Sequence, residues 1–259
     1  MGANPIFELF EIICAELVFQ PTQILSEDDI GDDLLNDVMD HFEETSKSSA
    51  FRRALADLQA HFIERGASLP FTVDHPTGQF KAVDIDYIDF VAFAKNHRGV
   101  GGEDSKNFEI RIANRLRVRL TGDLRRVGAP RDRMKKRAEI VKYLEGLGFD
   151  KNCIENDDKD GGLDILWLPP LGAVPLRPVV SLQCKNSFFD EEAANASTGR
   201  ATRTLRRHSH HRGDYLKFVI FNDYIDRSRF SGRAAGWSFL PLGLTDLAAP
   251  DGSDILDVL

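Results

Sequence analysis

The sequence predicts an α/β protein in which a mainly helical first part precedes a sheet flanked by helices. Apolar residues recur at helical spacing through residues 5–66. Short apolar runs bounded by Gly, Pro or polar residues come later, in LDILWLPP, PVVSLQCK and LKFVIFND, and GWSFLPLGLTDLA adds a fourth. Because helical patterns precede and separate the runs, we expect helices to cover a central sheet.

The first part of the chain is expected to be an acidic, mainly helical domain covering residues 1–100. It holds 18 acidic and 7 basic side chains, a net charge of −11. Its last strongly helical segment ends at Gly66, as a helix with a glycine C-cap would, and HPTG then predicts a hairpin turn. The composition of NHRGVGGEDSKN, at 96–107, is typical of a linker, so the second domain is placed at 101–259.

The second domain should begin with two helices and continue with the strands. NFEIRIANRLRVRL carries apolar residues at helical spacing, and KKRAEIVKYLEGLGFD predicts a helix that ends at Gly146 or Gly148. Along the chain, the predicted elements then have the order helix, strand, strand, helix, strand. This order predicts an α/β core in which helices pack against a sheet.

The charge of the chain is distributed unevenly. The net charge is −8, but residues 101–259 hold 23 acidic and 26 basic side chains, a net charge of +3. Two basic segments, at 111–137 and 199–212, are typical of surfaces that meet phosphates. The residues predicted to contact nucleic acid are Arg125, Arg126, Lys135, Lys136, Arg203, Arg206, Arg207 and His208.

Several classes of protein are excluded by composition. No apolar run approaches the roughly 18 residues that cross a membrane, and the first residues lack the basic start and cleavage site of a signal peptide. Three scattered cysteines, an odd number, argue against a disulfide framework. We therefore expect a cytoplasmic protein with no membrane partner.

Polar groups gather where the first two apolar runs meet their flanks. The two-residue period of a strand sends Gln183 and Lys185 to one face of VVSLQCK, and Cys184 to the other. If LDILW pairs with this strand, Asp164 lies beside them. A carboxylate and a neutral oxygen can hold Mg²⁺, and a lysine can orient a water and offset charge on a phosphorane.

The residues in AEIVKYLEGLGFD, DGGLDILW and VVSLQCKNS resemble the catalytic core of the PD-(D/E)xK nuclease superfamily, and most closely its Mrr-type restriction endonuclease branch, over roughly residues 137–225. The resemblance implies a restriction-endonuclease-like core. It also implies that Asp164, Gln183 and Glu139 are metal ligands and that Lys185 is the catalytic lysine. Glu109 competes with Glu139 as the helix carboxylate. The chain differs from the branch in the 19-residue step from Asp164 to Gln183, and in having Asn186.

These observations predict a magnesium-dependent endodeoxyribonuclease, with Mn²⁺ as an alternative ion, acting in restriction or another defence against foreign DNA. DNA is the expected substrate and a homodimer the expected way to cut two strands. The acidic first domain would bind a protein partner, mediate dimerisation or regulate the enzyme. Other interpretations are a repair or junction-resolving nuclease, a non-catalytic binding module that retains the fold, and an interaction protein led by residues 1–100.

Overall fold

The computed structural model describes residues 4–25, 27–127, 137–154, 162–170, 179–207, 216–225 and 239–248. The chain divides into two compact units. The first contains Met1–Asn96 with Ala248–Leu259, and the second contains His97–Leu247.

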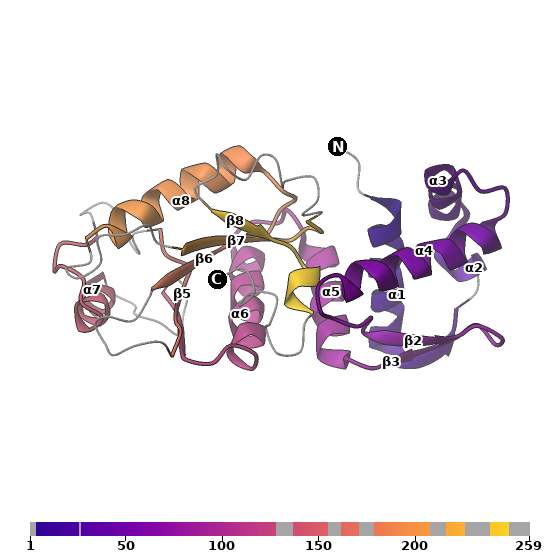
Figure 1. The fold of residues 1–259 in the computed structure, drawn as a ribbon, viewed down its shortest axis with the longest axis horizontal. Coiled ribbons are helices and arrows are strands. Elements are labelled where there is room, and N and C mark those ends of the chain that lie inside the picture. The colour runs from indigo at the N-terminus through magenta and orange to yellow at the C-terminus, as the bar shows by residue number, and fades with distance from the viewer. Residues whose placement is uncertain are drawn as a thin grey trace. The chain divides into compact units, whose positions relative to one another are not determined.

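The first unit is mainly helical and carries a small antiparallel sheet with strand order β1-β3-β2. Its elements are α1 (Pro5–Phe19), β1 (Thr22–Ile24), α2 (Glu27–Ile30), α3 (Asp32–Phe42), α4 (Lys47–Ile63), β2 (Phe71–Asp74), β3 (Gln79–Ala82) and α5 (Ile85–His97) (Figure 1). The hairpin predicted at HPTG is confirmed, because β2 and β3 pair on either side of it.

Local capping and an aromatic core explain how this unit holds together. The Asn4 side chain accepts a hydrogen bond from the Ile6 amide at 3.0 Å, and a proline occupies the first helical turn of α1. The Phe10 ring lies 5.3 Å from Phe62 and 6.5 Å from Tyr87, centroid to centroid. All three side chains are fully buried, so they supply much of the apolar burial of the unit.

The second unit is an α/β structure, as predicted. Its sheet has the strand order β4-β5-β6-β7-β8; the first three strands are antiparallel neighbours, and β6, β7 and β8 run parallel. Its elements are α6 (Glu103–Arg117), β4 (Asp123–Arg126), α7 (Arg137–Gly146), β5 (Ile165–Leu168), β6 (Val180–Lys185), α8 (Glu191–Leu205), β7 (Leu216–Phe221), β8 (Leu240–Leu242) and the short 3₁₀ helix η3 (Thr245–Leu247).

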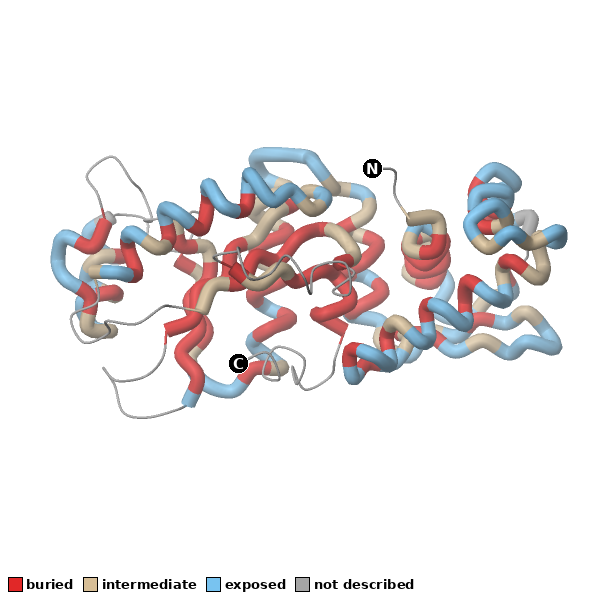
Figure 2. The backbone as a smooth tube through the Cα atoms, turned by 45° about the horizontal axis from the view of Figure 1, so that its top comes forward, coloured by how far each residue is buried: buried red, intermediate tan, exposed pale blue. Residues whose placement is uncertain are grey.

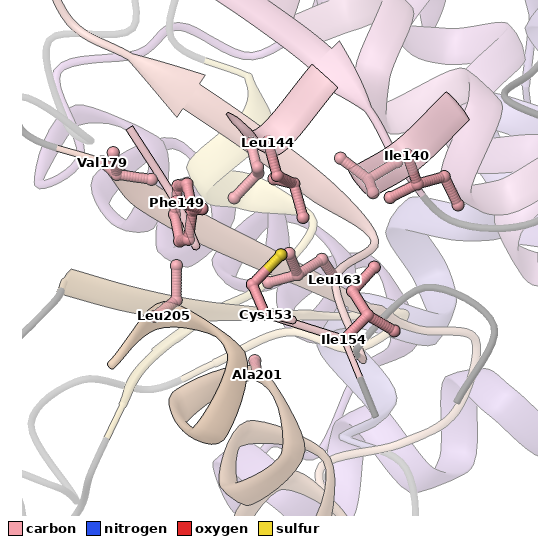
Figure 3. Packing of buried hydrophobic residues seen from close by; sticks show 11 residues of the cluster. Ile140, Leu144, Phe149, Cys153, Ile154, Leu163, Val179, Ala201 and Leu205 are labelled. Carbon is pink, nitrogen blue, oxygen red and sulfur yellow. The ribbon is translucent and has the colours of Figure 1, made fainter. Parts of the chain in front are cut away.

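Helices cover both faces of this sheet, with α8 and α6 on opposite sides (Figure 1). On one face, Leu166 of β5 packs in a buried cluster with side chains from α7 and α8. Figure 3 shows Leu144 of α7 and Leu205 of α8 in this cluster. Lys217 of β7 lies on this face and donates a hydrogen bond to Thr202 of α8 at 2.9 Å. On the other face, Arg126 of β4 pairs with Glu109 of α6. Figure 2 shows the alternation of buried and exposed residues along α8 that such packing requires.

The sequence did not predict the first strand of the sheet. The expected helix at 107–120 is observed as α6, Glu103–Arg117, and the chain then forms β4 from DLRR. This stretch lacks an apolar run, and only pairing with β5 makes it a strand.

Among the described residues, no helix is long and apolar enough to cross a membrane.

Candidate active site

Asp164 and Gln183 lie opposite each other at the point where β5 begins. The antiparallel register pairs Ile165 with Leu182, so the preceding residue, Asp164, faces Gln183. The backbone N–H of Cys184 donates to Asp164 Oδ2 at 2.8 Å, and the N–H of Val127 donates to the Asp164 carbonyl at 2.8 Å. Asp164 is therefore fixed from the strands on both sides of it.

The Gln183 side chain is almost completely buried, with 2% of the residue exposed. Its amide nitrogen donates to the carbonyl of Gly162, which leaves the amide oxygen as the atom available for a ligand. Gly162 belongs to the GG sequence before Asp164, so the same loop that supplies the aspartate also orients the glutamine.

Lys185 lies two residues further along β6, on the face that Gln183 occupies. The residue is half-buried, and in the described part of the chain its ammonium forms no ion pair or hydrogen bond, while its backbone carbonyl accepts from the Asn222 N–H at 2.8 Å. Because no described side chain holds this ammonium, it is available to a ligand at this end of the strand.

The two faces of β6 separate the competing helix carboxylates. Ser181, Gln183 and Lys185 lie on the face covered by α7 and α8, because Ser181 pairs with Leu166 and with Lys217, which pack against those helices. Glu139 stands exposed in the first turn of α7.

Glu109 projects from α6 onto the opposite face of the sheet. Its carboxylate lies 3.5 Å from Arg126 Nε, and each of the two side chains is 11% exposed. The strand register places Arg126 on the same face of the sheet as Leu182. Cys184, two residues after Leu182, lies on that face too. Glu109 therefore belongs to a buried ion pair on the face of the sheet opposite to the side chains of Gln183 and Lys185.

Cys184 lies between Gln183 and Lys185 in the sequence, but its side chain is on the opposite face of the sheet, with Glu109 and Arg126. Burial raises the pKa of its thiol well above the ordinary value; Asp164 and Glu109 raise that pKa further, whereas Lys185 and Arg126 lower it. The neutral thiol favoured by this environment is a poor nucleophile.

The predicted phosphate contacts are partly exposed. Arg203 is exposed on α8 and Arg206 is exposed directly after it, as its C-cap. Arg125 is exposed, with its guanidinium carbon 5.0 Å from the ring centroid of Tyr143. Arg207 is half-buried and donates to the Asn152 carbonyl. Lys135, Lys136 and His208 lie outside the described residues. Arg126 is directed to Glu109 rather than to solvent, so it differs from the other predicted contacts.

The donor atoms at the strand ends suit a hard divalent cation. Asp164 offers a carboxylate and Gln183 an amide oxygen, and Mg²⁺ is commonly held by one or two carboxylates together with substrate phosphate oxygens. Within the described ranges, no group of three or more His, Cys, Asp and Glu side chains is placed to hold a metal. A metal here would rely on the Asp164 carboxylate, the Gln183 amide and oxygens from the substrate.

A buried asparagine pair fixes the end of the same strand, and the sequence analysis did not find it. Asn222 Nδ2 donates to Asn186 Oδ1 at 2.8 Å, and Asn186 Nδ2 donates to the carbonyls of His97 at 2.7 Å and Val100 at 3.0 Å. Arg98 Nε donates to the Asn222 carbonyl at 2.8 Å. The available signal was an asparagine directly after each of two apolar runs. The segment that resembled a linker is held against β6 and β7.

Comparisons with known proteins add little to this geometry. No family model matches the chain, and no curated protein matches it. Among solved structures, the chain is similar to the protein VC1899 from Vibrio cholerae, with 10% identity and a TM-score of 0.28. The match covers 97% of this chain and 51% of that protein, so the chain spans about half of its length. A similarity this weak carries no argument about fold or function.

Proposed function

We propose that the protein is a metal-dependent endonuclease that hydrolyses DNA phosphodiester bonds, in restriction or another defence against foreign DNA. The observation that carries the proposal is Lys185, a half-buried lysine without an ion-pair partner in the described part of the chain, beside Gln183 and the fixed carboxylate of Asp164. A mixed sheet flanked by helices also agrees with the restriction-endonuclease-like core that the sequence resemblance implies.

Asp164 and Gln183 would hold Mg²⁺ through their oxygens, with Glu139 as the helix carboxylate. Glu139 is preferred to Glu109 because α7 covers the face of the sheet on which Gln183 and Lys185 lie, whereas Glu109 pairs with Arg126 on the other face. When bound, the metal would polarise the phosphate and stabilise its developing negative charge.

The remaining work falls to side chains of the protein. Lys185 would hydrogen-bond the attacking water, orient it toward the phosphorus and offset the charge of the pentacoordinate transition state. The hydrogen bonds from Cys184 to Asp164 and from Gln183 to Gly162 keep the two oxygen ligands in place before substrate arrives. Arg203 and Arg206 are exposed cations that can contact the DNA backbone.

Incubation of the purified protein with plasmid DNA tests the proposal. The substrates are methylated and unmethylated plasmid, supercoiled and linear, each in Mg²⁺, in Mn²⁺ and in EDTA. We expect the wild type to cleave only with metal, and Lys185→Ala to lose cleavage while its affinity for DNA changes by no more than a few fold.

Lys217→Ala is the matched control, because Lys217 is a half-buried lysine on the same face of the neighbouring strand that already bonds Thr202. The Lys217→Ala protein should still cleave DNA. Cleavage retained by Lys185→Ala would refute the assignment of the lysine. Binding of DNA without cleavage by the wild type in either metal would favour a non-catalytic module.

A further inference from the structure

Gly162 is the point at which the loop that carries Asp164 touches α8. Its φ of +72° lies in the region that favours glycine. A Cβ at this position would lie 2.7 Å from Arg200 Cβ and 3.2 Å from the Ala201 amide nitrogen. The Gly162 carbonyl also accepts the hydrogen bond of Gln183. One glycine therefore brings the candidate metal ligands and the stem of Arg200 together.

Arg200 is an exposed residue with an unused guanidinium. Its guanidinium forms no ion pair or hydrogen bond with the residues that the structure describes. It is the first basic residue of α8, whose first turn is acidic, with Glu191 and Glu192. Arg203 lies one helical turn further on and is also exposed. The positive part of α8 thus begins where the helix touches the loop of Asp164.

We infer that Arg200 is a substrate-binding residue, whose guanidinium receives a phosphate of the DNA backbone next to the phosphate held at Asp164 and Gln183. This inference rests on the proposed function and specifies how the substrate is bound. A guanidinium can bind two phosphate oxygens at once, and the contact of its stem with Gly162 restricts where it can reach. Gln183 is neutral, so the strand ends offer Arg200 one carboxylate fewer that would compete with the DNA phosphate for its guanidinium.

The test is the salt dependence of DNA binding, measured in Mg²⁺ with the Lys185→Ala protein so that the DNA stays intact. Fluorescence anisotropy of a labelled duplex gives the affinity over a range of KCl concentrations. Arg200→Gln keeps most of the stem that packs on Gly162 and removes the charge. We expect it to weaken binding about tenfold, and to reduce the slope of log affinity against log salt by about one.

Two further variants make the result specific. Arg200→Lys retains a positive charge and should keep the parental slope. Arg52→Gln, at an exposed arginine of the acidic first unit and outside both basic segments, removes the same charge and should change the affinity by less than about twofold.

An unchanged slope in Arg200→Gln would overturn the inference and leave the nuclease proposal in place, since the parent protein would still bind DNA. A slope reduced equally by Arg52→Gln would also overturn it, because the effect would then follow overall charge. If the parent binds no DNA and the wild type cleaves none, the proposed function fails and the inference fails with it.

Discussion

The buried pair of Glu109 and Arg126 allows a quantitative test of the assignment of the two helix carboxylates. Removing one partner of a buried ion pair typically costs about 3–5 kcal/mol, because the other charge remains uncompensated. Here the nitrogen and oxygen lie 3.5 Å apart and each side chain is 11% exposed, which places the cost near the lower limit. We expect Glu109→Ala to reduce the free energy of unfolding by about 3 kcal/mol, which corresponds to a fall in Tm of roughly 6–12 °C.

Denaturant unfolding followed by tryptophan fluorescence measures this change, since Trp167 is fully buried in β5. The double variant Glu109→Leu with Arg126→Met should recover most of the loss, because it removes both charges and keeps apolar volume. Glu139→Ala removes an exposed carboxylate and should change stability by less than about 0.5 kcal/mol, yet abolish metal-dependent cleavage.

The reasoning would be refuted by a Glu109→Ala protein within about 1 kcal/mol of the wild type. It would also be refuted if Glu139→Ala cleaved DNA normally while Glu109→Gln, still folded, did not. Either outcome would mean that the face of the sheet does not decide which carboxylate serves the site.

Three other predictions concern residues around the site. Gly162→Ala should lose about 1–3 kcal/mol of stability in thermal unfolding, from its positive φ and the contact with Arg200; an unchanged Tm would contradict that contact. The Cys184 thiol should resist iodoacetamide at mildly alkaline pH until the protein is denatured, because its pKa is raised, and rapid native labelling seen by mass spectrometry would disprove this. Burial, with Asp123, raises the pKa of Tyr143 to about 12 from 10.0, so its contribution to stability is complete below pH 10 and is lost as the pH rises toward 12. In the described part of the chain its buried hydroxyl has no hydrogen-bond partner, so Tyr143→Phe should remove this alkaline loss and add about 1 kcal/mol at neutral pH; a less stable variant in urea titration would contradict it.

Much of the second unit follows from local pattern. The runs that became β5, β6 and β7 are apolar and bounded by Gly, Pro or polar residues, so their strands could be predicted. The two-residue period of β6 also separated Gln183 and Lys185 from Cys184 correctly, because a strand that pairs on both sides keeps its alternation.

Other features depend on long-range contacts that leave little mark on the sequence. The strand β4 is made by its pairing with β5 rather than by its own composition. The asparagine pair requires the parallel register of β6 and β7, which sets Lys185 beside Phe221 and so brings Asn186 to Asn222. The separation of Glu109 and Glu139 by the sheet needs the packing of both helices, because each follows a helical pattern that suits either face.

The most direct test of the central claim is the rate of plasmid cleavage as a function of Mg²⁺ concentration, for the wild type and for Gln183→Glu. Cleavage by the wild type should rise from zero in EDTA to a plateau with Mg²⁺. Replacing the amide of Gln183 by a carboxylate adds one negative charge to the metal ligands, so half-maximal activity should occur at a lower Mg²⁺ concentration. Cleavage that persists in EDTA, or an unchanged Mg²⁺ requirement in Gln183→Glu, would contradict a metal held by this residue.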